Sequence, residues 1–115
     1  MPSTPTVASH FTKSAPPVRA TYDAVLAAAR SLGPVREEAK KTSIHLVRSS
    51  AFAGVVTRSN GLVLTLKAAK KLDSSRVRRA EQTSANRWHL EIPLATANDV
   101  DAELRAWLQQ AYELA

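Results

Sequence analysis

The chain has 115 residues, of which 44% are hydrophobic and 23% charged, so it can build one hydrophobic core but not two. The sequence contains no cysteine, which excludes disulfides, zinc ribbons and thiol catalysis. No stretch approaches the roughly 18 apolar residues that span a bilayer, and residues 1–17 lack the apolar run of a signal peptide. We therefore expect a cytoplasmic location and no membrane partner.

The net charge of +6 is unevenly distributed along the chain. Residues 36–87 carry twelve of the sixteen lysines and arginines but four of the ten acidic residues, which gives this stretch a net charge of +8. Residues 88–115 are acidic by contrast. A field of this kind favours a polyanion as partner. The alternative is a basic surface that serves solubility alone.

The N-terminal segment is expected to be a tail followed by a helix. Residues 1–14 are rich in Pro, Ser and Thr and are predicted to be mostly disordered, with residues 15–115 as a single domain. Phe11 is an exception, since it could fold back and anchor the tail on the core. Apolar residues recur at intervals of three and four from about residue 16 to 32, which predicts a helix. The Gly-Pro pair at residues 33–34 ends it.

Six short strands are predicted next, because apolar residues alternate with polar ones between turn residues. In residues 62–67 three leucines alternate with Val63, Thr65 and Lys67, so one sheet face should be buried and the other wet. Asn60-Gly61 predicts the hairpin turn before this strand. The strands are predicted at residues 35–38, 43–48, 51–58, 62–67, 77–82 and 87–94.

A last helix is predicted from about residue 99 to 114, with Asn98 as its cap. The acidic residues of its first turns suit the helix dipole, so the C-terminal acidity has a structural explanation. The expected fold class is therefore α+β: a two-layer sandwich in which an antiparallel meander sheet of five or six strands is flanked in sequence by an N-terminal and a C-terminal helix.

The order of short motifs along residues 10–114 resembles an uncharacterised family, domain of unknown function 5655. The resemblance rests on His10-Phe11, LGPV at 32–35, KKTSIHL at 40–46, AFA at 51–53, GLVL at 61–64, LDS at 72–74 with Arg76-Val77, and residues 101–112. It implies a compact α+β domain. The family supplies no established activity, cofactor or catalytic residue.

The basic residues of the strands and their ends are the main candidates for a binding site. Where such side chains share the wet face, they would contact nucleic-acid phosphates with salt-dependent, sequence-independent affinity. The alternative is a solvated face whose charges protect strand edges from aggregation. The candidate phosphate-binding residues are Lys40, Lys41, Arg48, Arg58, Lys67, Lys70, Lys71, Arg78 and Arg79.

Enzyme chemistry is weakly indicated, and we predict no catalytic residue, metal or cofactor. Glu38-Ala39-Lys40 matches half of a metal-dependent nuclease core, which needs a further carboxylate on a neighbouring strand. His45, His89 and Glu91 could in principle hold zinc. A small-ligand pocket between sheet and helices, lined by His45, Thr65 and His89, is the remaining alternative.

The aromatic residues argue against a platform for stacking bases, because Tyr22, Phe52, Trp88 and Trp107 mostly fall at core positions. The sequence therefore favours a small non-catalytic binding module that contacts nucleic-acid phosphates through a basic sheet face. A protein-interaction or homo-oligomerisation module is the alternative, followed by a small-ligand or metal-dependent enzyme domain.

Overall fold

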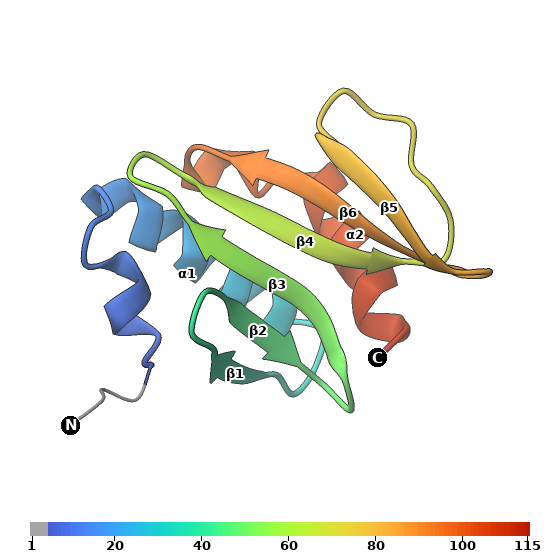
Figure 1. Ribbon diagram of the computed structural model, residues 1–115, viewed down its shortest axis with the longest axis horizontal. Helices are drawn as coiled ribbons and strands as arrows, with labels where there is room; N and C mark the ends of the chain where they lie inside the picture. Colours follow the sequence, from blue (N-terminus) through green and yellow to red (C-terminus); the bar gives the residue numbers. More distant parts are fainter. Residues whose placement is uncertain (1–4) are drawn as a thin grey trace.

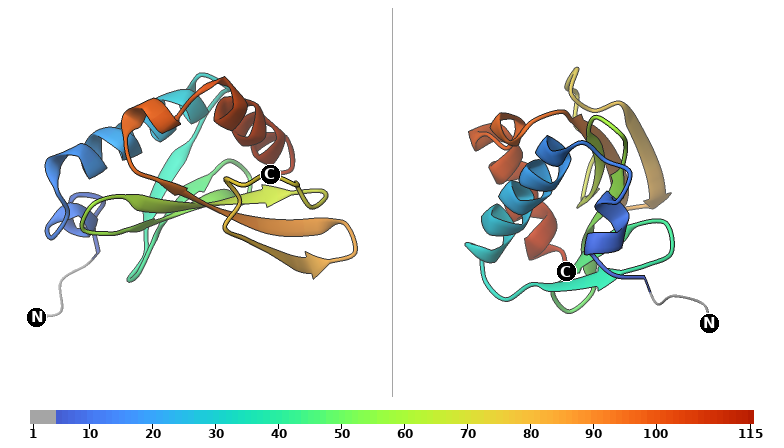
Figure 2. Two further views of the ribbon diagram at one scale, coloured as in Figure 1. Left: turned by 90° about the horizontal axis from the view of Figure 1, so that it is seen from above. Right: turned by 90° about the vertical axis from the view of Figure 1, so that its left-hand side faces the viewer.

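The computed structural model describes residues 5–115, and it has two layers. One layer is a six-stranded sheet, and the other consists of two helices that lie on the same face of that sheet (Figures 1 and 2). Figure 1 looks onto the sheet from the side that the helices leave uncovered. The predicted α+β class, with a helix before and a helix after the strands, is confirmed.

The helices and strands follow the predicted order with small shifts at their ends. The elements are η1 (Ala8–Phe11), α1 (Pro16–Arg30), β1 (Arg36–Ala39), β2 (Ile44–Val47), β3 (Ala51–Thr57), β4 (Leu62–Ala68), β5 (Arg79–Ser84), β6 (Arg87–Leu94), η2 (Ala97–Asp99) and α2 (Ala102–Glu113). The largest shift is in α2, which begins three residues later than predicted, after η2. The strand β5 begins two residues later than predicted. Val77 is held in a turn by its N–H bond to the Ser74 carbonyl, so the strand cannot start there.

The strand order is β1-β2-β3-β4-β6-β5, and all neighbouring strands are antiparallel. The first four strands form the expected meander. The chain then passes the position next to β4, forms β5 at the outer edge, and returns as β6 between β4 and β5 (Figure 1). As a result β6 is a central strand, although its Pro93 suggests an edge.

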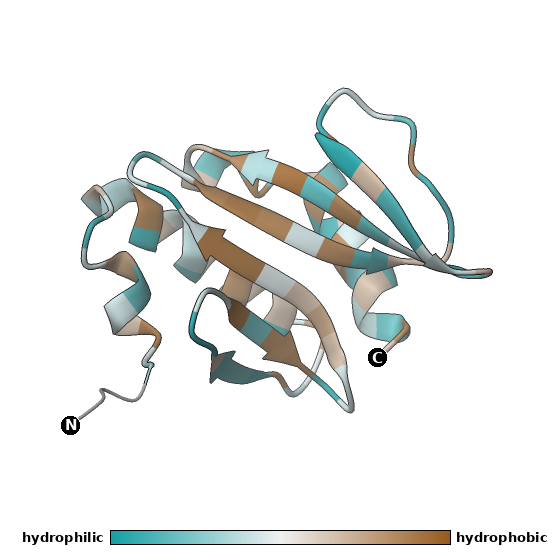
Figure 3. Ribbon diagram, viewed as in Figure 1, coloured by the Kyte–Doolittle hydropathy of each residue, from teal (hydrophilic) through white to brown (hydrophobic). Residues whose placement is uncertain are grey.

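The core lies between the helices and one face of the sheet. Ile44, Val55, Leu64 and Ile92 stand side by side on four neighbouring strands, and each is completely buried. They pack with apolar residues of both helices, such as Leu104 of α2. The alternation of apolar and polar residues along β4 and β6 is visible as bands in Figure 3. Strand periodicity therefore assigned the buried face correctly.

The N-terminal segment packs against α1. The ring of Phe11 in η1 lies 5.3 Å from that of Tyr22, so Phe11 contacts the core as anticipated. The backbone N–H of Ala15 donates to the Ser59 carbonyl, which ties the start of α1 to the β3–β4 turn. Residues 1–4 of the predicted disordered tail lie outside the described residues.

The end of α1 depends on Gly33, whose φ of +152° is unfavourable for residues with a side chain. The Tyr112 hydroxyl occupies the space beside Gly33 and donates a hydrogen bond to the Pro34 carbonyl. At the other helix, Asp101 is the N-cap and accepts from the Leu104 N–H at 3.0 Å. The prediction of Asn98 as this cap is wrong, because the chain first forms η2.

Candidate functional site

The open face of the sheet carries one row of side chains that crosses all six strands. In register, the row comprises Glu38, His45, Gly54, Thr65, Glu91 and Arg79, one from each strand. These residues alternate with the buried ones, so they lie on the face opposite the helices. Gly54 is in the middle of this row and has no side chain, so the face is lowest along β3.

A bulge deepens the same region of the open face. The pairing of β2 with β3 shifts between Leu46 and Val47, where Val47 faces Ala51 and Leu46 faces Ala53. The extra residue, Phe52, is 1% exposed and packs edge-on against the Tyr112 ring of α2 at 5.3 Å. A strand with such an extra residue can turn two consecutive side chains to the same face. The position opposite Lys67 on β3 is therefore bare as well.

These two bare positions produce a hollow of about 280 Å³ on the open face. It is lined by Ser43, His45, Ala51, Phe52, Ala53, Gly54, Val56, Thr65, Lys67 and His89. The polar groups among them are one ammonium, two imidazoles and two hydroxyls, and none is a carboxylate. The hollow can therefore donate hydrogen bonds to a ligand that carries negative charge. Its floor is the backbone of β3.

The carboxylates near the hollow are engaged by neighbouring cations. Glu38 lies 3.2 Å from both Arg36 and Lys40. These two cations hold the pKa of the Glu38 carboxyl below its usual value, chiefly through the hydrogen bond from Arg36. Glu91 accepts from Arg78 at 2.8 Å. Both carboxylates of the row are thus paired with cations.

Lys67 is the lysine that lines the hollow. Its ammonium donates to the Ser50 hydroxyl at 3.2 Å, and within residues 5–115 no carboxylate lies within ion-pair distance of it. His89 is its direct neighbour on β6. A lysine without a carboxylate partner at the rim of a hollow is suited to bind an anion.

The nine predicted phosphate-binding residues do not share one surface. Lys40, Lys41 and Arg58 lie at the end of the sheet that carries the β1–β2 and β3–β4 turns. At the opposite end lie Arg48, Lys67, Lys70 and Lys71. Arg78 and Arg79 are at the β5 edge, where they pair with Glu91 and Glu81. The basic stretch of the sequence is therefore divided among two ends and an edge.

Arg48 is directed away from the open face. Its guanidinium lies 4.5 Å from the centre of the Tyr112 ring and donates to the Tyr112 carbonyl at 3.1 Å. A cation over an aromatic ring near the end of a helix stabilises that end. This residue is thus engaged in joining the β2–β3 turn to α2.

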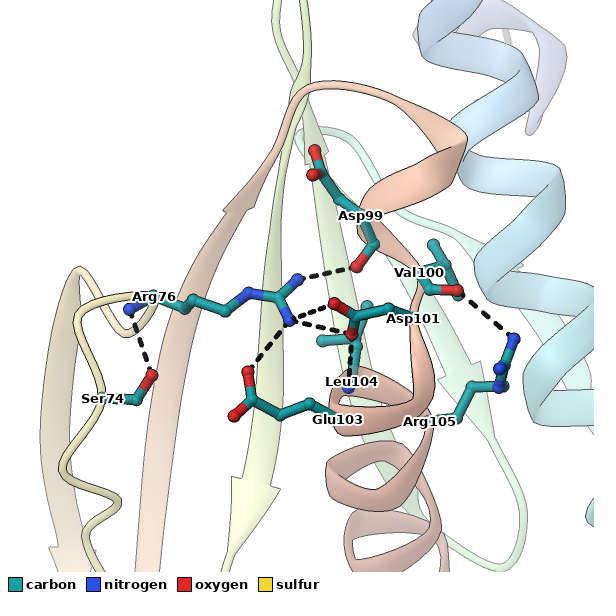
Figure 4. A network of polar contacts seen from close by, with 8 residues as sticks. All are labelled: Ser74, Arg76, Asp99, Val100, Asp101, Glu103, Leu104 and Arg105. Carbon is teal, nitrogen blue, oxygen red and sulfur yellow. Dashed lines mark hydrogen bonds and ion pairs between the residues drawn. The ribbon is translucent and has the colours of Figure 1, made fainter.

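The sequence pattern gave no indication that Arg76 has a structural role. Its guanidinium donates to Asp101, Glu103 and the Asp99 carbonyl at 2.7–3.1 Å (Figure 4). The hydrogen bond to Asp101 is the main reason that the pKa of Arg76 is raised. The arrangement fixes the β4–β5 connection to the start of α2. Nothing in the local sequence indicates a contact between residues 25 positions apart.

The three predicted pocket residues, His45, Thr65 and His89, all line the hollow. The expected location between sheet and helices is wrong, however, because that space is filled by the aliphatic core. By strand alternation the three side chains belong to the opposite face.

The side chains named for a zinc site or a metal-dependent nuclease do not come together in the described residues. His45 and His89 are on β2 and β6, three strand spacings apart, which corresponds to about 14 Å between backbones. Glu38 is occupied by two cations, and Asp23 of α1 pairs with Arg19. In the part of the chain that the structure describes, no three acidic or histidine side chains come close enough to hold a metal ion.

The aromatic residues Tyr22, Phe52, Trp88 and Trp107 lie on the covered side of the sheet or in the helix layer. Tyr22 and Phe52 are buried, and Trp107 packs against the core. Trp88 is half-buried near the β5–β6 turn and lies outside the core cluster. It shares the helix side of the sheet with Leu90, because it alternates with His89. Of the aromatic rings among the residues that line the hollow, the imidazoles of His45 and His89 therefore belong to the open face, while Phe52 is turned inward.

Two helices on one face of a six-stranded antiparallel sheet define a small two-layer α+β domain. Residues 7–115 match the family described as Domain of unknown function (DUF5655), and the chain belongs to this family. The resemblance found from short motifs is thereby confirmed. No curated protein and no solved structure matches the chain. Neither helix within the described range is long and apolar enough to cross a membrane.

Proposed function

We propose that this domain is a small non-catalytic binding module that holds nucleic acid against the open face of its sheet through phosphate contacts. The observation that carries the proposal is the hollow beside Lys67, which offers an ammonium, imidazoles and hydroxyls but no carboxylate. Phosphate oxygens accept hydrogen bonds from groups of these kinds. The predicted cytoplasmic location stays a prediction and is compatible with such a ligand.

The contacts are proposed to centre on three lysines rather than on all nine candidates. Lys67 borders the hollow, and Lys70 and Lys71 follow it at the end of β4, where both are exposed. No described carboxylate lies within ion-pair distance of any of the three. Arg78 and Arg79 have acidic neighbours, and Arg48 is bound to Tyr112. Binding a phosphate therefore costs the three lysines no existing ion pair.

The test is the binding of fluorescently labelled DNA, measured by anisotropy between about 50 and about 200 mM salt. Three phosphate contacts predict a slope of log affinity against log salt of about −2 to −3. A Lys67→Gln, Lys70→Gln, Lys71→Gln variant should remove most of this slope. The control replaces Arg19, Arg30 and Arg105 of the helix layer by Gln, which changes the net charge equally.

Equal losses in the two triple variants would mean that net charge alone drives binding, and would contradict a site on the open face. The absence of binding by the wild-type protein at about 50 mM salt would remove the proposal altogether. Both proteins must be compared at the same salt concentration, because phosphate contacts weaken steeply with salt.

Self-association through β5 is the second candidate function. β5 is the edge strand beyond β6, and five of its six residues are exposed. Unpaired N–H and C=O groups on such an edge can pair with the edge of a second copy. Its charged residues Arg79 and Glu81 oppose this pairing. Sedimentation that gives a monomer at every protein concentration would exclude it.

A further inference from the structure

Gly54 is an unusual residue for the centre of a sheet. It lies inside β3, which is paired on both sides, with β2 and β4. Among the described residues Gly33 is the glycine with a positive φ, so the backbone at Gly54 is one that any residue can adopt. A glycine inside a strand weakens the strand, and it often marks a place where a ligand approaches the backbone.

The surroundings of Gly54 leave room for a side chain. A Cβ atom built there would lie 3.7 Å from Cδ2 of His45 and 4.0 Å from Cβ of Thr65, which are ordinary contact distances. Alanine would therefore fit without strain and would favour the extended strand. The fold therefore does not require glycine at this position, and the missing side chain leaves the space above the strand open to a ligand.

The space above Gly54 is bounded on two sides by side chains. His45 and Thr65 border it from the two neighbouring strands, whose backbones are about 10 Å apart. The hollow of about 280 Å³ is slightly smaller than the range of about 300–1,000 Å³ that is typical of small-molecule sites. It can receive a single ring and is too small for a large cofactor.

We propose that this hollow receives one unpaired base of a nucleic-acid strand, so that the module prefers single-stranded to duplex nucleic acid. The inference rests on the proposed function and specifies its ligand. The base lies on the backbone at Gly54, the His45 ring contacts it from the side, and Lys67 binds an adjacent phosphate. Ser43 and Thr65 supply hydroxyls for hydrogen bonds with the edge of the base.

Duplex nucleic acid cannot use this site, because its bases are paired and stacked in the interior of the helix. Proteins that bind single strands combine a positively charged path with side chains that contact the faces of bases. Histidine is one of the aromatic residues that act in this way. Phe52 turns inward at the bulge, so its ring is not available to stack on the base. The bare backbone that it leaves on the open face enlarges the floor on which the base would lie.

The experiment compares a ten-nucleotide thymidine strand with a duplex of the same length at about 50 mM salt, using the full chain. The wild-type protein should bind the single strand about tenfold more tightly. Gly54→Ala places a methyl group on the floor of the hollow and should weaken single-strand binding about tenfold, with duplex binding unchanged within twofold. His45→Ala should reduce single-strand binding about fivefold. Ser84→Thr is the control, because it adds a methyl group on the exposed end of β5.

The thermal midpoint of Gly54→Ala, measured alongside, should equal or exceed that of the wild-type protein, which separates a lost site from a damaged fold. If the wild-type protein bound single strand and duplex equally and Gly54→Ala had no effect, the proposed base site would be wrong. The proposed phosphate binding would still stand in that case. A parallel loss of both ligands in Gly54→Ala would also overturn it, since the methyl group would then obstruct phosphates. If the wild-type protein bound neither ligand, the proposed function itself would fail.

Discussion

The two faces of the sheet are built from the same strands but respond to different requirements. On the covered face, neighbouring residues such as Leu64 and Ile92 are completely buried and fill the space beneath the helices. On the open face, the hollow is lined by hydroxyls, imidazoles and a glycine that the fold does not need. Stability is therefore concentrated on one face, and the residues of the other face are not needed to hold the core together.

The largest expected effect is on the covered face. Leu64→Ala removes a completely buried side chain at the centre of the core, and it should lower the free energy of unfolding by about 2–5 kcal/mol. The adjacent Thr65→Ala on the open face should change it by no more than about 0.5 kcal/mol. Urea denaturation of both variants measures the difference. Similar losses would mean that the two faces are not energetically distinct.

The glycines Gly33 and Gly54 should differ in how much they contribute to stability. Gly33→Ala should lower the free energy of unfolding by about 1–3 kcal/mol, because its φ of +152° is unfavourable and the new methyl group would clash with the Tyr112 hydroxyl. Gly54→Ala should leave stability unchanged or raise it by up to about 1 kcal/mol. Chemical denaturation tests both. Equal destabilisation would show that Gly54 has a structural role after all.

Arg76 tests whether the edge of the sheet depends on the helix layer. Its side chain is 24% exposed, and its hydrogen bonds connect the β4–β5 connection to α2. Arg76→Gln should lower the free energy of unfolding by about 1–2 kcal/mol. Arg76→Lys should restore little of this, because an ammonium lacks the planar fork of donors. Thermal unfolding of both variants measures the loss of stability. If Arg76→Lys were as stable as the wild-type protein, the positive charge alone would matter.

The smallest effect is expected at acid pH. The Leu104 N–H and then Arg76 hold the pKa of the Asp101 carboxyl below its usual value. A carboxyl with a lowered pKa in the folded state stabilises the protein above its unfolded pKa of about 3.9, and this contribution is lost as the pH falls through the folded value. In a plot of melting temperature against pH, the curve of Asp101→Asn should therefore approach that of the wild-type protein as the pH falls below about 3.9. Parallel curves would contradict the assignment.

Sequence patterns predicted those parts of the molecule that depend on local repetition. Alternation in residues 62–67 and 87–94 placed the leucines on one face and Thr65, Lys67 and His89 on the other. The three pocket residues were thus identified together, although on the wrong side of the sheet. The pattern says which side chains share a face, but it does not say which face the helices cover.

The remaining features depend on contacts between distant parts of the chain. The edge position of β5 was not predicted, because a polar strand of six residues carries no signal for its neighbour. The bulge at Phe52 interrupts the alternation by one residue, which a sequence pattern does not distinguish from an ordinary strand. The division of the basic residues follows from strand order, and so it could not be foreseen either.

The position of β6 between β4 and β5 has a consequence for the time course of folding. The strands β1 to β4 are joined by short turns, and β5 and β6 form a local hairpin. These two pieces meet along one seam, from Leu62 opposite Leu94 to Ala68 opposite Trp88. Closing a seam between distant segments is slow compared with forming turns. We therefore expect the β4–β6 seam to set the folding rate, with the open face complete only after it has closed.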